Sequence, residues 1–88
     1  MRVVILGAGV VGGSIAEFLC NERHSVTVVE SNIDRAQEIN RDLDVRVVEG
    51  SASESTTLFQ ADVIGADLCM AVTGSEEVNI LAASMAKA

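Results

Sequence analysis

The chain has 88 residues, of which 49% are hydrophobic, enough for one small domain with an aliphatic core. Its net charge of −7 disfavours binding to nucleic acid and to anionic lipid, because both are polyanions. No apolar run approaches the roughly 20 residues of a membrane span, and no signal peptide precedes the first predicted strand. We therefore expect a soluble, cytoplasmic domain without direct membrane insertion.

The first thirty residues hold the most informative pattern. An apolar strand over Arg2–Leu6 leads into a G-x-G-x-x-G loop, a helix over 11–21, a strand over 25–29 and the acid Glu30. The loop residues are Gly7, Ala8, Gly9, Val10, Val11 and Gly12. Strand, glycine loop, helix, second strand and terminal acid together form the dinucleotide-binding fingerprint. The sequence therefore predicts a site for an adenine dinucleotide.

Each glycine of the loop has its own expected role. Gly7 allows the tight turn out of the strand, Gly9 lets the backbone approach a pyrophosphate, and Gly12 lets the helix lie close to the strand. The pyrophosphate would then lie at a helix N-terminus, which favours anions. The alternative is an empty Rossmann-like unit that keeps the glycines for packing alone.

Glu30 predicts which dinucleotide binds. Its carboxylate can accept hydrogen bonds from both ribose hydroxyls, whereas the 2′-phosphate of NADP would face it as a second anion. At about 4 Å and an effective dielectric near 20, two such charges repel by roughly 4 kcal/mol, which favours NAD or NADH. Arg35, five residues on, could offset this repulsion, but it is better placed to stack on the adenine face. The alternatives are a plain acid at the strand end for Glu30 and a solvated residue of the first helical turn for Arg35.

The remaining elements alternate between helix and strand. They are a helix over 34–42, a strand over 45–49, a short helix over 54–60, a strand over 68–72 and a helix from about residue 75 to the end. Short apolar strands between helices are typical of an α/β, Rossmann-like, doubly wound parallel sheet, here with strand order 3-2-1-4. Without a fifth strand, the strand over 68–72 would be an open apolar edge. We therefore expect residues 1–88 to be one truncated domain, the N-terminal part of a longer chain or a unit completed by association.

Two segments follow strand ends, where open α/β sheets bind ligands. Ser51 and Ala52 could lie along the adenine, or the segment could be a turn in which Ser53 caps the short helix. Thr73 and Gly74 would border the pyrophosphate and the second ribose. Alternatively, the T-x-x-E spacing that begins at Thr73 is a helix capping box.

These residues together resemble the TrkA family, regulatory subunits of Trk potassium-uptake systems whose N-terminal domain is of the RCK (KTN) class. The likeness runs from residue 1 to about residue 80 and rests on residues 1–12, Glu30, 34–35, 47–52 and 71–73. It implies NAD or NADH in the Rossmann cleft, with ADP or ATP in relatives. It also implies a homo-oligomer at the inner face of the membrane, bound there to a potassium-translocating subunit. The resemblance makes nucleotide contacts of the glycine loop, Glu30, Arg35, Ser51, Ala52, Thr73 and Gly74.

Two classes of function compete for this chain. A dehydrogenase needs a proton donor or a metal near the nicotinamide, and we identify neither a catalytic Cys/His pair nor a C-x-x-C motif in the sequence. We therefore expect no catalytic residue and no metal ligand, with Cys20 and Cys69 as small core residues. With the resemblance counted, a regulatory nucleotide-binding domain is the favoured interpretation. The residues alone leave the cofactor domain of an NAD-dependent dehydrogenase as a nearly equal alternative, because many dehydrogenases open with the same pattern over the first thirty residues.

Overall fold

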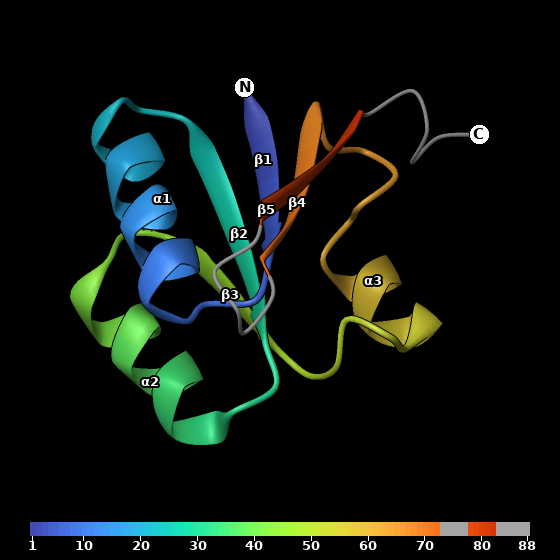
Figure 1. Cartoon of the computed structure of the whole chain (residues 1–88), viewed down its shortest axis with the longest axis horizontal. Helices are drawn as coiled ribbons and strands as arrows, with labels where there is room; N and C mark the ends of the chain where they lie inside the picture. The colour runs from blue at the N-terminus through green and yellow to red at the C-terminus, as the bar shows by residue number, and fades with distance from the viewer. Residues whose placement is uncertain (73–77, 83–88) are drawn as a thin grey trace.

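The chain has an α/β fold, with one mixed β-sheet and helices on both of its faces (Figure 1). The computed structural model describes residues 1–72 and 78–82. The strands are β1 (Arg2–Leu6), β2 (Ser25–Glu30), β3 (Arg46–Glu49), β4 (Leu68–Val72) and β5 (Val78–Ala82). The helices are α1 (Val10–Asn21), α2 (Ile33–Asp42) and α3 (Ser55–Gln60). The elements from β1 to β4 match the predicted ones to within one residue at each end.

The strand order is β3-β2-β1-β4-β5, and the first four strands run parallel. This confirms the predicted Rossmann-like sheet with order 3-2-1-4. The chain starts in the middle of the sheet at β1, builds outward through β2 and β3, and then crosses back to place β4 on the other side of β1. The carboxyl end of β1 is therefore the point at which the direction of winding reverses, where open α/β sheets bind ligands.

The prediction of a helix from about residue 75 to the end is wrong for residues 78–82. They form β5, which pairs antiparallel with β4 from Val72 against Val78 to Leu68 against Ala82. A short apolar run fits either a helix or a strand, so the local pattern does not decide between them. Pairing with β5 supplies partners for backbone groups along a β4 edge that would otherwise be open.

The core has two layers because the central strands are covered on both faces. Helices α1 and α2 cover one face and α3 covers the other (Figure 1). Neighbouring residues of β1 divide between the layers: Val3 and Ile5 face α1 and α2, whereas Val4 faces α3. Burial on both sides explains why the strands appear in the sequence as continuous apolar runs.

The two cysteines differ in their surroundings. Cys69 on β4 is fully buried in the α3-side layer, as predicted for a small core residue, and burial raises the pKa of its thiol. Cys20, near the end of α1, is only half-buried, and its Sγ donates to the carbonyl oxygen of Asp44 at 3.3 Å.

Candidate functional site

The glycine loop lies at the switch point of the sheet, between the end of β1 and the start of α1. Gly7 has a φ of +103°, and a Cβ there would lie 2.6 Å from the carbonyl oxygen of Val72. A Cβ on Gly12 would lie 2.3 Å from the carbonyl oxygen of Gly7. Both positions therefore require glycine for backbone packing. Gly9 is different, because a Cβ there would meet no atom of the described residues 1–72 within 4 Å. The open space in front of Gly9 is where a ligand could approach the backbone.

The N-terminus of α1 presents backbone amides at this same place. Gly9 is the N-cap residue, so no side chain caps the helix, and the first turn holds no acidic residue. The first intrahelical bond runs from the Gly13 N–H to the Gly9 carbonyl at 2.8 Å. The amides of Val10, Val11 and Gly12 thus have no acceptor within the helix. Together with the helix dipole, they make this end of α1 favourable for an anion.

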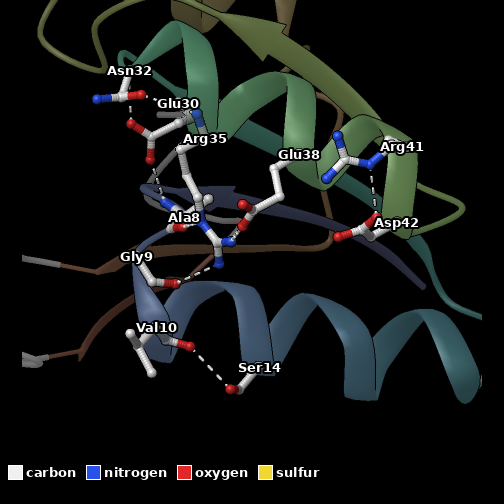
Figure 2. Close-up of polar contacts among 10 residues, drawn as sticks. All are labelled: Ala8, Gly9, Val10, Ser14, Glu30, Asn32, Arg35, Glu38, Arg41 and Asp42. Carbon is white, nitrogen blue, oxygen red and sulfur yellow. Dashed lines mark hydrogen bonds and ion pairs between the residues drawn. The ribbon is translucent and has the colours of Figure 1, made fainter.

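Glu30 lies beside the loop, at the end of β2 (Figure 2). Its Oε1 accepts a hydrogen bond from the Ala8 N–H, and its Oε2 accepts one from the Asn32 N–H, both at 2.8 Å. The carboxylate therefore joins the glycine loop to the start of α2. A carboxylate has about four acceptor positions, so the two bonds leave acceptor capacity for sugar hydroxyls. The hydrogen bonds that Glu30 accepts from Ala8 and Asn32 were not predicted. The one local signal was an Asn directly before a helix, which indicates an N-cap residue.

Arg35 comes from the first turn of α2, and its guanidinium lies against the loop backbone (Figure 2). Its Nε donates to the Ala8 carbonyl, its Nη2 donates to the Gly9 carbonyl at 3.3 Å, and its Nη1 pairs with Glu38. The structure thus brings Glu30, Arg35 and the loop together, and their role as nucleotide contacts stays a prediction. Stacking of Arg35 on an adenine stays a prediction.

The segment after β3 forms a compact turn next to the end of β2. The Gly50 N–H donates to the Glu30 carbonyl at 3.0 Å, which ties the ends of the two strands together. Ser51 is half-buried, and its Oγ lies 2.7 Å from the Oγ of Ser53, while Ala52 is exposed. Glu54, not Ser53, is the N-cap of α3, and no side-chain bond caps that helix. The alternative of a Ser53 cap is therefore wrong.

Thr73, Gly74 and the T-x-x-E box fall outside the described residues. Across residues 1–72, no cluster of three or more His, Cys, Asp or Glu side chains could hold a metal ion. The helices in the described part of the chain all lack the length and apolar character needed to cross a membrane.

Comparison with known proteins gives one consistent result. Residues 3–88 match the family model of the TrkA-N domain. The chain is 44% identical over 86 residues to the Trk system potassium uptake protein TrkA of Halomonas elongata, and 43% identical over 86 residues to that of Vibrio alginolyticus. Each alignment covers 98% of this chain but 19% of the relative. A TrkA homolog of Pyrococcus abyssi is 39% identical over 87 residues, covering 99% of this chain and 38% of the relative. The chain thus spans only a minor part of the length of these relatives.

Proposed function

This chain belongs to the TrkA-N domain family, and from that premise we propose that it is an NAD(H)-binding regulatory domain of a potassium-uptake system. In this proposal the nucleotide binds at the switch point of the sheet, and its presence biases assembly and ion transport. The domain acts within a homo-oligomer, at the inner face of the cell membrane, through a potassium-translocating partner. The names of its relatives as potassium uptake proteins support this assignment.

The observation that carries the proposal is the pairing of an uncapped helix N-terminus with an adjacent carboxylate. The amides at the start of α1 suit a diphosphate, and the open space at Gly9 lets that group come close to the backbone. Glu30, held at 2.8 Å from the Ala8 amide, then faces the ribose beside the diphosphate. The same carboxylate disfavours a 2′-phosphate, so NAD or NADH is preferred over NADP. ADP and ATP share the adenosine and phosphate groups and are the competing ligands.

Calorimetric titration with NADH, NADPH and ATP tests the proposal. Gly9→Ala is the informative variant, because its backbone (φ −66°) is one that alanine adopts and the added Cβ meets no atom within 4 Å in the part of the chain that the structure describes. We expect this variant to keep its thermal unfolding midpoint but to lose NADH binding, since the methyl group occupies the approach path. Its matched comparison is Gly12→Ala, whose methyl group strikes backbone and is expected to reduce stability instead.

Two results would contradict the proposal. One is a folded wild-type protein that binds none of these nucleotides, and the other is Gly9→Ala binding NADH as wild type does. The dehydrogenase alternative has its own test, in which NADH is incubated with the protein and candidate oxidants. Steady oxidation of NADH would favour the enzyme, whereas a regulatory domain shows no turnover.

A further inference from the structure

Three consecutive peptide groups of the glycine loop are fixed by two side chains from neighbouring elements (Figure 2). Glu30 accepts the N–H of Ala8, which belongs to the peptide group between Gly7 and Ala8. Arg35 donates to the carbonyls of Ala8 and Gly9, which belong to the next two peptide groups. Since a peptide group is planar and its N–H points opposite to its C=O, holding each carbonyl also sets the direction of the following N–H. Arg35 therefore helps set the direction of the Gly9 amide and, together with the Gly13 N–H that donates to the Gly9 carbonyl at 2.8 Å, that of the Val10 amide.

The geometry of Arg35 suits this task. Its side chain is 31% exposed and reaches from α2 to the loop with all three guanidinium nitrogens engaged, Nη1 being paired with Glu38 on the same helix. A planar fork of donors can hold two adjacent carbonyls in one orientation, which a single ammonium group cannot do equally well. Arg35 also places a positive charge directly beside the loop backbone.

A glycine that the fingerprint does not explain supports the same conclusion. Gly13 follows the G-x-G-x-x-G motif and lies buried inside α1, where glycine is less favourable than alanine. A Cβ at this position would lie 2.3 Å from the Nη2 of Arg35, but at an ordinary 3.5 Å from the Cδ1 of Ile39. The guanidinium is thus the group that a methyl group at position 13 would displace.

We propose that Arg35 is a positioning residue of the dinucleotide site, which orients the loop amides toward the diphosphate, and that Gly13 is the residue that makes room for it. This inference rests on the proposed function, because it assigns how the same site holds its ligand. This positioning role differs from adenine stacking in which part of the ligand loses affinity when Arg35 is replaced. A positioning role acts on the diphosphate, whereas stacking acts on the adenosine.

The test compares Arg35→Gln and Arg35→Lys with Arg41→Gln. Arg41 lies on the same helix, is 71% exposed and pairs with its neighbour Asp42, so Arg41→Gln removes the same charge without touching the loop (Figure 2). We expect Arg35→Gln to weaken binding of NADH and ADP about tenfold or more, and to change adenosine binding less than about twofold. Arg35→Lys, which keeps the charge but not the fork, is expected to recover part of the lost affinity. Arg41→Gln is expected to bind all three ligands as wild type does.

Gly13→Ala supplies the second arm. Its methyl group displaces the guanidinium, so we expect NADH affinity to fall as in Arg35→Gln, while the double variant binds no more weakly than Arg35→Gln alone. In nucleotide-free protein, both single variants should shift the amide resonances of Gly9 and Val10 in NMR spectra, and Arg41→Gln should not.

The outcomes separate the inference from the proposed function. A wild-type protein that binds no nucleotide contradicts the proposed function, while unshifted Gly9 and Val10 amides in the variants overturn the inference by themselves. Equal losses for adenosine and ADP would show that Arg35 contacts the adenine instead. Additive losses in the double variant would show that Gly13 acts independently of Arg35.

Discussion

Replacing Glu30 by glutamine is the most direct way to test the ligand preference derived from this site. Glutamine keeps the size of the side chain but turns one carboxylate oxygen into an NH₂ group that cannot accept a hydrogen bond. One of the two backbone donors, the Ala8 or the Asn32 amide, then loses its acceptor. Because Glu30 is only half-buried, water can replace part of that bond. We expect a loss of about 1 kcal/mol in the free energy of unfolding, or roughly 5 °C in the unfolding midpoint.

The effect on ligand choice is larger than the effect on stability. A 2′-phosphate oxygen about 4 Å from the carboxylate is repelled by roughly 4 kcal/mol at an effective dielectric near 20, and glutamine removes this repulsion. Glutamine also weakens the proposed hydrogen bonds to the ribose hydroxyls of NADH, because they would no longer be charge-assisted. Both changes reduce the preference for NADH. After allowance for screening by salt, we expect the ratio of NADH to NADPH affinity to fall at least about tenfold.

Isothermal titration with both cofactors at two salt concentrations measures this ratio. Glu49→Gln is the matched control, because Glu49 is the register partner of Glu30 on β3 and is exposed. It removes the same charge from the neighbouring strand end, and we expect it to change the ratio less than about twofold. A folded Glu30→Gln protein with an unchanged ratio would refute the reasoning, as would wild-type protein that binds NADPH as tightly as NADH.

Three further predictions concern stability and reactivity. Gly12→Ala should lower the free energy of unfolding by about 2–3 kcal/mol in urea denaturation, because its Cβ would lie 2.3 Å from a backbone carbonyl; a wild-type midpoint would contradict this packing. A thiol reagent should label half-buried Cys20 in the native protein, whereas fully buried Cys69, whose pKa is raised by burial, should react only on unfolding; equal rates would contradict the assigned burial. The Arg2 guanidinium lowers the pKa of Asp62 below 3.8, so Asp62 stabilises the fold above that pH and loses this effect as the pH falls. The stability difference between wild type and Asp62→Asn should therefore vanish in acid, and a constant difference would contradict the ion pair.

The elements from β1 to β4 could be predicted because their signals are local. Parallel strands covered on both faces produce unbroken apolar runs in the sequence. The loop after β1 requires glycine because a Cβ at Gly7 or Gly12 would clash with a backbone carbonyl. The position of Glu30 follows from the same logic, since the last residue of β2 must lie beside the end of β1 in a parallel pair. The fold and the positions of Gly7, Gly12 and Glu30 within it were therefore predictable.

Interactions set by elements distant in sequence could not be predicted. The run 78–82 suits a helix or a strand, and pairing with the edge of β4 decides the outcome. The direction of the Arg35 side chain depends on how α1 and α2 lie together on one face of the sheet. Gly13 was a signal of this packing, since a second glycine inside a helix has no role in the fingerprint, but its meaning required the position of Arg35.

The way the loop is held also limits how a bound nucleotide can influence the rest of the protein. A ligand shifts a conformational equilibrium only as far as its affinities for the two states differ. Helix α2 is joined to the loop by two links, from Glu30 to the Asn32 amide and from Arg35 to the loop carbonyls. A change in the direction of the loop amides is therefore accompanied by a change in the contacts of α2. If α2 takes two positions, the factor by which nucleotide affinity differs between them equals the factor by which the nucleotide biases that equilibrium. Comparing the affinity of a domain whose α2 is held in one position with that of the free domain therefore tests the coupling that the proposed regulatory function requires.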